Sequence, residues 1–144
     1  MEIKELVTAI SLKHKEQGIK IHSPATSKEL FIFEKQIGFL LPADFREFYS
    51  LCNGFACDED IFNITPLQEI ADCGKNWFLF AEYMIFSDSW GLRFIDDAKY
   101  EIFYSNYDKA AIATSMNEFL ERFLRGNVFD EGGLYDWLKE LGIR

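Results

Sequence analysis

Two kinds of hydrophobic pattern divide the chain. Near both ends, apolar residues recur every three or four positions, which is typical of amphipathic helices. In the middle, short apolar and aromatic runs are separated by polar turns at spacings of 8–10 residues, which is typical of an antiparallel meander. This order predicts an α+β fold, in which N-terminal and C-terminal helices pack on a mainly antiparallel sheet of about five or six strands.

The clearest predicted helix follows Pro42, a residue that is tolerated at the first helical position. Its apolar positions have the spacing i, i+3, i+4 and i+7 and form one stripe: Phe45, Phe48, Tyr49 and Cys52. The pair Asn53-Gly54 favours a left-handed end to this helix. Three aromatic side chains on one face need cover, so we expect the rest of the chain to pack over this helix.

The remaining elements follow from the same patterns. Further helices are predicted at about residues 2–16, 27–37, 115–125 and 134–141. Thr26 and Glu29 have the spacing of a capping box, although Ser27 is an equally good cap, and Ser115 and Glu118 have the same spacing. Strands are predicted at residues 61–64, 77–80, 83–86, 92–95 and 100–104, with shorter extended segments at 19–22 and 110–114. Residues 87–91 and 96–99 are predicted as turns.

Length and composition favour one folded unit. A chain of 144 residues fits a single domain spanning residues 1–144, and a hydrophobic content of 49% argues against disorder. The three cysteines are odd in number and lack paired metal-ligand spacing, which predicts reduced thiols. The N-terminus lacks the apolar region of a signal peptide, and no apolar run has transmembrane length, so we expect a cytoplasmic protein.

The negative charge is concentrated in the middle of the chain. The net charge is −9, and residues 55–108 hold 11 acidic but only 3 basic side chains. Nucleic acids and anionic membranes bind basic surfaces, so this distribution disfavours both as partners. It suits a cationic protein partner, although solubility alone would also explain it.

The sequence offers no recognisable catalytic constellation. His14 continues the apolar stripe of the first helix and Cys52 lies on the stripe of the third, so we interpret both as packing residues. The sequence lacks the phosphate-binding loop, the dinucleotide-binding motif, the nucleophile elbow and the zinc-protease motif. We therefore predict that the chain is not an enzyme and needs no cofactor. The carboxylate clusters at 58–60 and 96–97 lack calcium-loop spacing and read as solvated turns.

One stretch also carries a family resemblance. Residues 41–54 read Leu-Pro-x-Asp-Phe-x-x-Phe-Tyr-x-x-Cys-Asn-Gly, which resembles the signature of the SUKH superfamily of Smi/Knr-type domains. The resemblance extends in order from Thr26 to Gly126 and includes a Ser-x-x-x-Phe-Leu helix at Ser115. It implies a SUKH-like fold and a non-enzymatic role, most often an immunity protein that neutralises a cognate bacterial toxin such as a nuclease. The alternative that it implies is a cytosolic regulatory scaffold like the yeast cell-wall-synthesis regulators.

We predict that partners bind an acidic surface that carries an aromatic anchor. Its candidate residues lie in the predicted turns: Asp58, Glu59, Asp60, Asp88, Trp90, Asp96 and Asp97. Trp90 either faces the core or is the exposed anchor, and the sequence leaves both readings open. The expected partner is a toxin with a basic surface, and the expected state of the free protein is a monomer or a weak homodimer.

Overall fold

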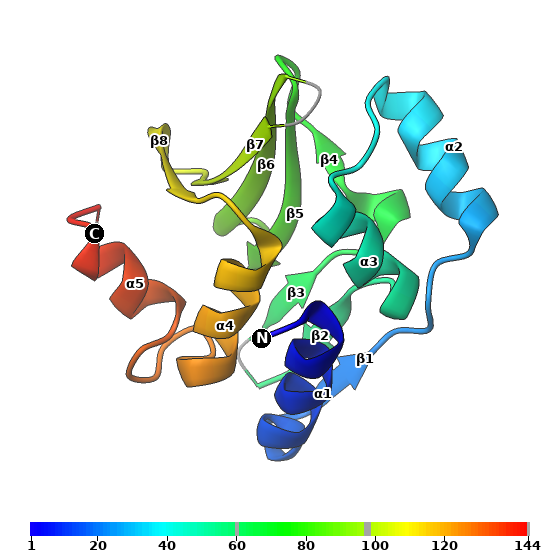
Figure 1. Ribbon diagram of the computed structural model, residues 1–144. Helices are drawn as coiled ribbons and strands as arrows, with labels where there is room; N and C mark the ends of the chain where they lie inside the picture. Colours follow the sequence, from blue (N-terminus) through cyan, green and yellow to red (C-terminus); the bar gives the residue numbers. More distant parts are fainter. Residues whose placement is uncertain (60, 97–98, 144) are drawn as a thin grey trace.

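A computed structural model describes residues 1–59, 61–96 and 99–143. Within these ranges the chain has helices near both ends and an antiparallel sheet between them, which confirms the predicted α+β class (Figure 1). The α-helices are α1 (Ile3–Lys13), α2 (Ser27–Ile37), α3 (Ala43–Leu51), α4 (Met116–Gly126) and α5 (Leu134–Glu140). Two short 3₁₀ turns are η1 (Lys15–Gln17) and η2 (Leu67–Glu69).

The described strands form one sheet of eight, more than the five or six predicted. They are β1 (Ile19–Ile21), β2 (Phe55–Cys57), β3 (Phe62–Ile64), β4 (Ala71–Asp72), β5 (Trp77–Tyr83), β6 (Asp88–Asp96), β7 (Lys99–Tyr104) and β8 (Tyr107–Ala113). The order is β1-β2-β3-β5-β6-β7-β8, and β4 pairs with β5. Strands β2 and β4 were not among the predicted strands, because two or three residues are too few to show an alternating pattern.

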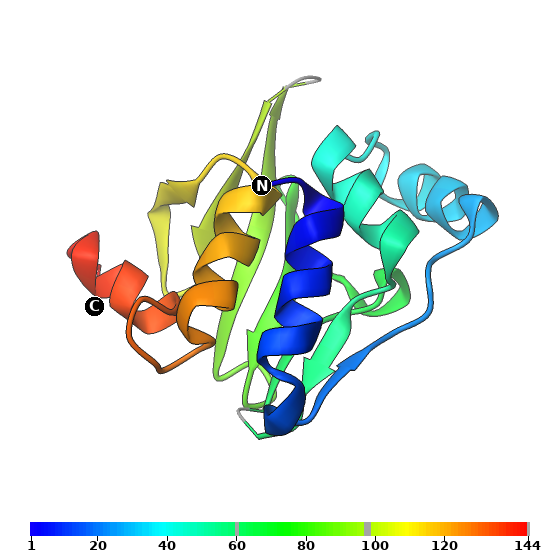
Figure 2. The same ribbon diagram turned by 60° about the horizontal axis from the view of Figure 1, so that its bottom comes forward.

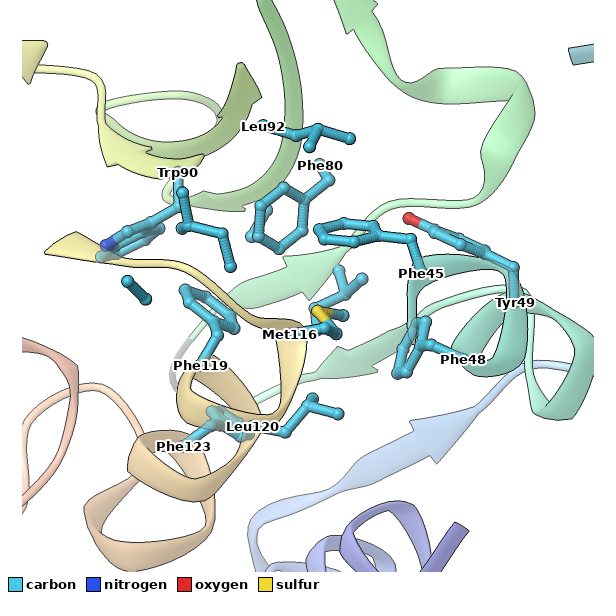
Figure 3. Packing of buried hydrophobic residues seen from close by; sticks show 14 of the residues in the cluster. Phe45, Phe48, Tyr49, Phe80, Trp90, Leu92, Met116, Phe119, Leu120 and Phe123 are labelled. Atoms are coloured by element: carbon cyan, nitrogen blue, oxygen red, sulfur yellow. The ribbon is translucent and has the colours of Figure 1, made fainter. Parts of the chain in front are cut away.

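The predicted stripe of α3 is confirmed, because all four of its side chains are 0% exposed. Figure 3 shows Phe45 of α3 directed at Phe80 of β5, with ring centroids 5.1 Å apart in an edge-to-face arrangement. The hydroxyl of Tyr49 donates to the carbonyl of Thr65 at 2.9 Å, so this buried polar group is satisfied. The apolar face of helix α3 therefore packs in the core against the neighbouring strands.

The ends of α3 differ slightly from the prediction. Pro42 is the N-cap and not the first helical residue, and the helix ends at Leu51. Gly54 then has a φ of +84°, and a Cβ atom at this position would lie 2.2 Å from the carbonyl oxygen of Ile64. Only glycine fits both this backbone conformation and this close approach.

The predicted cap of α2 is also confirmed. The Thr26 hydroxyl accepts a hydrogen bond from the Glu29 N–H at 3.1 Å, and the Glu29 carboxylate accepts one from the Thr26 N–H at 3.0 Å. In α4, Ser115 accepts from the Glu118 N–H at 3.2 Å. These bonds satisfy backbone donors that have no partner inside the helix.

Helices α1, α3 and α4 lie side by side over one face of the sheet (Figure 2). Phe119 of α4 packs between Phe80 and Trp90, with centroid distances of 5.2 and 6.1 Å. On the opposite face, Arg93 lies over the ring of Trp77 at 5.1 Å. Alternation along β6 thus separates a helix-covered apolar face from a face that carries a charged side chain.

The prediction was wrong at the junction of β5 and β6. Residues 83–86 were predicted as a strand and 87–91 as a turn, whereas β5 ends at Tyr83 and β6 begins at Asp88. The pairs Tyr83↔Asp88 and Ala81↔Trp90 set the observed register. This register buries the indole of Trp90, and the free energy of that burial outweighs the local preference of Ser87 and Ser89 for a turn.

Candidate protein-binding surface

The predicted acidic residues lie at two separate ends of the sheet. Asp58 and Glu59 precede β3, whose first residue pairs with Tyr83 next to the start of β6, whereas Asp96 ends β6. A strand rises about 3.3 Å per residue, so the two ends are roughly 25 Å apart. Figure 2 shows the β5–β6 turn at one end of the sheet and the β6–β7 hairpin at the other. Asp60 and Asp97 lie outside the described residues.

Asp88 is not a surface carboxylate, which corrects its prediction as part of an exposed turn. It is 7% exposed, and its carboxylate accepts hydrogen bonds from the Asn106 amide at 2.7 Å and from the hydroxyls of Tyr104 and Tyr135. These donors come from β7, the loop after it and α5, so Asp88 ties α5 to the sheet. A buried carboxylate with three donors stabilises the fold and is inaccessible to a partner.

Trp90 is likewise a core residue, so the reading in which it is an exposed anchor is wrong. Its side chain is 0% exposed, and its ring contacts Phe62, Tyr104 and Phe119 at centroid distances of 5.7–6.1 Å (Figure 3). Among the described residues, its indole N–H has no hydrogen-bond partner. Its position therefore depends on ring packing, and the residue cannot contact a partner in this conformation.

Asp58 and Glu59 do lie on the surface, as predicted. Their N–H groups donate to the carbonyls of Gly18 and Gln17 at 3.3 and 3.2 Å, which fixes the loop against the end of η1. The carboxylate of Asp58 is 3.2 Å from the Lys20 ammonium, and both side chains are more than half exposed. An exposed pair of this kind contributes little to stability, so these carboxylates are accessible to long-range attraction by a partner.

Exposed apolar side chains surround these carboxylates at the same end of the sheet. Ile61 follows the acidic loop and is 51% exposed, while Phe86 in the β5–β6 turn is 47% exposed. Phe129, in the α4–α5 loop, is 53% exposed and contacts the ring of Tyr83 at 5.1 Å. We call this region the loop-end surface, defined by these residues: Asp58, Glu59, Ile61, Met84, Ile85, Phe86 and Phe129.

The loop-end surface combines exposed apolar side chains with exposed carboxylates. Aromatic side chains, which tend to anchor protein complexes, adjoin carboxylates that would attract a basic partner. Two further exposed carboxylates, Asp130 and Glu131, follow Phe129 in the α4–α5 loop. Asp88 and Trp90 do not contribute to this surface, whose exposed aromatic side chains are Phe86 and Phe129.

The opposite end of the sheet, here the hairpin end, carries Asp96 and a cavity of about 470 Å³. The polar part of this cavity is already engaged in the fold. Asp44 accepts the Met116 N–H at 2.8 Å and the Tyr100 hydroxyl, and it thereby supports the start of α4. Burial and the adjoining Asp44 raise the pKa of Tyr100, so that this phenol stays protonated and donates.

Cys52 and His14 are occupied in packing, whereas the Cys73 thiol is exposed. Burial raises the pKa of the Cys52 thiol to about 12, so the reactive thiolate is scarce near neutral pH. His14 is 3% exposed, and its ring nitrogens lie 2.6 Å from the Gln17 side-chain oxygen and 3.1 Å from the Phe123 carbonyl. This confirms its interpretation as a packing residue.

Within residues 1–59, 61–96 and 99–143, no group of three or more His, Cys, Asp or Glu side chains has an arrangement that could hold a metal ion. Within the same ranges, every helix is too short or too polar to cross a membrane.

Sequence reasoning missed the exposed turn between β5 and β6. Met84, Ile85 and Phe86 form an apolar run that contains a β-branched residue, which is the composition of a buried strand. The polar cluster Ser87-Asp88-Ser89 did not reveal this turn, because it indicated a turn at residues 87–91, where the structure has the start of β6. Phe129 had a clearer signal, because it precedes the glycines at 132 and 133 in a segment between two predicted helices.

Comparison with known proteins gives one family match. The family model described as SMI1 / KNR4 family (SUKH-1) matches residues 24–122. The matched segment begins just before α2 and ends within α4, so it contains α3, the strands from β2 to β8 and the β5–β6 turn. A search of curated proteins finds no match.

Proposed function

This chain belongs to the SMI1 / KNR4 family (SUKH-1), and from that membership we propose that it is an immunity protein that binds and neutralises a cognate bacterial toxin. The role is non-enzymatic: the chain occludes a functional surface of the toxin. The observation that carries the proposal is the loop-end surface, where exposed aromatic side chains adjoin exposed carboxylates. A nuclease toxin must bind anionic nucleic acid through a basic cleft, and an acidic surface is complementary to such a cleft.

In this proposal, charged and apolar residues affect different steps of binding. The carboxylates of Asp58 and Glu59 attract the toxin and raise the association rate, an effect that added salt screens. Phe86 and Phe129 hold the complex after contact, because buried aromatic side chains mainly slow dissociation. Asp96, roughly 25 Å away by strand rise, lies beyond the screening length of about 8 Å at physiological salt and adds little to attraction at the loop end.

The test measures binding kinetics against a candidate toxin, expressed from a gene that neighbours the gene of this chain. We expect the double variant Asp58→Asn, Glu59→Gln to lower the association rate by about threefold to tenfold at low salt. The difference should shrink as ionic strength rises, while the dissociation rate stays nearly constant. Surface-plasmon measurements at two ionic strengths give both rates.

Asp96→Asn is the matched control, since it removes a carboxylate from the hairpin end of the same sheet. At physiological ionic strength its association rate should stay close to that of the wild type, and at about 0.01 M salt, where the screening length is about 30 Å, its effect should be smaller than that of the loop-end variant. A larger effect at Asp96 than at the loop end would move the interface to the hairpin end. Failure of the wild type to bind the toxin would contradict the proposed function and favour a regulatory scaffold.

A further inference from the structure

The β5–β6 turn has an uncommon backbone for its residue types. Met84, Ile85 and Phe86 have φ angles of 50°, 51° and 62°, so three consecutive residues other than glycine adopt the left-handed conformation. Glycine, asparagine and aspartate are the residues that usually occupy such positions, and a β-branched residue there is an outlier. Ile61, next to the turn, has a φ of 52° as well.

Polar contacts from buried groups hold this strained backbone in place. The carboxylate of Glu82, a residue only 7% exposed, accepts the Phe86 N–H at 2.9 Å and the Asn63 side-chain amide at 2.5 Å. The Met84 N–H donates to the Ile61 carbonyl at 3.0 Å, which joins the turn to the neighbouring loop. The Ser87 hydroxyl donates to the Met84 carbonyl at 2.8 Å. Such contacts give the turn a defined shape before any partner arrives.

Burial within the chain does not account for these apolar side chains. Ile85 is 86% exposed, the largest exposed fraction of any large hydrophobic residue described, and Met84 is 46% exposed. Strained backbone persists where the surroundings fix it and where it has a use, and it concentrates at binding sites. An exposed apolar apex on a rigid turn is suited to insertion into a pocket.

We propose that the β5–β6 turn inserts the side chain of Ile85 into an apolar pocket on the toxin, flanked by Met84 and Phe86. This inference rests on the proposed function and adds the element that carries the binding energy. The pocket is expected to have a basic rim, since Asp58 and Glu59 lie beside the turn on the loop that holds Ile61. A second copy of this chain is a poor partner for this surface, because the loop-end carboxylates of the two copies would face and repel each other.

The decisive variant is Ile85→Asn. Asparagine tolerates the left-handed conformation and removes the apolar side chain. We therefore expect a higher urea midpoint of unfolding together with at least tenfold weaker binding to the same candidate toxin. Ile85→Val keeps an apolar β-branched side chain, and it should bind within about threefold of the wild type with a similar midpoint.

Ile95→Asn is the positional control, because Ile95 is 53% exposed and lies near the far end of β6. Its binding should match that of the wild type. If the wild type binds the toxin and Ile85→Asn binds it equally well, this inference is overturned while the proposed function stands. If the wild type does not bind the toxin, both are overturned. A lower midpoint for Ile85→Asn contradicts the strain argument, and a dimer in sedimentation that Ile85→Asn dissociates would make a second copy the occupant.

Discussion

Phe48 illustrates how far a single residue can be read from the sequence. Its place on the i, i+3, i+4, i+7 stripe of α3 predicted burial, and the side chain is 0% exposed. It packs edge-to-face on Tyr49 at 5.1 Å and contacts Phe55 of β2 at 6.3 Å. The spacing of apolar residues identified the buried face of α3, whereas the contact between Phe48 and Phe55 of β2 depends on the tertiary structure.

Truncating Phe48 should destabilise the fold strongly. Phe48→Ala removes a fully buried ring and leaves a cavity, so we expect a loss of about 3–5 kcal/mol in the free energy of unfolding. Phe31→Ala makes the same chemical change at a side chain that is 59% exposed, and it should lose less than about 1 kcal/mol. Urea denaturation of both variants gives the comparison, and similar losses would mean that the stripe is not the core of the fold.

Asp88 and Trp90 show where residue-level reading fails. Both were predicted in a turn, because Ser-Asp-Ser-Trp-Gly has the composition of one. The structure pairs them in β6 with β5 and β7, and donors from residues 104, 106 and 135 surround the Asp88 carboxylate. Those donors are distant from Asp88 in sequence, so no local pattern predicts these hydrogen bonds.

At the scale of elements, helices were easier to predict than strands. Helix α2 begins and ends where Thr26 and Gly38 indicate, since capping involves residues only a few positions apart. Strand boundaries depend on the partner strand. The apolar run from Met84 to Phe86 therefore looked like a strand, although the pairing of Tyr83 with Asp88 makes it a turn.

The cap of α2 gives a prediction at this scale. Thr26→Ala removes the acceptor for the Glu29 N–H and should lower the free energy of unfolding by about 1 kcal/mol. Thr8→Ala, at an exposed position inside α1, is the control and should have little effect or stabilise slightly. Equal losses in thermal or urea unfolding would argue against a capping role.

The same cap should be sensitive to acid. Hydrogen bonds from the Thr26 N–H and hydroxyl lower the pKa of Glu29 below its ordinary value of 4.5. A carboxyl whose pKa is lower in the folded state stabilises the fold above its unfolded pKa and loses this contribution as pH falls through the folded value. The stability difference between wild type and Glu29→Gln, which removes the titrating carboxyl, should therefore be full near neutral pH and shrink below about pH 4.5.

At the scale of the whole molecule, the sheet has one face that helices cover and two ends that carry exposed acidic residues. Strands β5, β6 and β7 are the long central members, and helices α1, α3 and α4 cover one face of the sheet (Figure 2). Asp58 and Glu59 lie at one end of these strands and Asp96 at the other. Composition predicted an acidic middle third, but only the antiparallel register reveals that its charges divide between the two ends.

Hydrogen exchange should reflect this arrangement. The amides in the middle of β6, which pairs with both β5 and β7 at residues 90–93, should exchange slowest because their opening requires global unfolding. The amides of β1, a strand of three residues at the edge of the sheet, should exchange far faster. Native-state exchange followed by mass spectrometry or NMR resolves the two, and equal protection would contradict a core centred on β6.

The β5–β6 turn has a consequence for how the specificity of such a protein can change. Residues 84–87 join two strands whose pairing is fixed on either side by Ala81↔Trp90 and Tyr83↔Asp88. A replacement turn of equal length would thus be grafted onto an unaltered core, with Glu82 still present to receive it. Under the proposed binding mode, recognition could change by exchange of this turn alone, and a chimaera that carries the turn of another family member should acquire the binding preference of the donor.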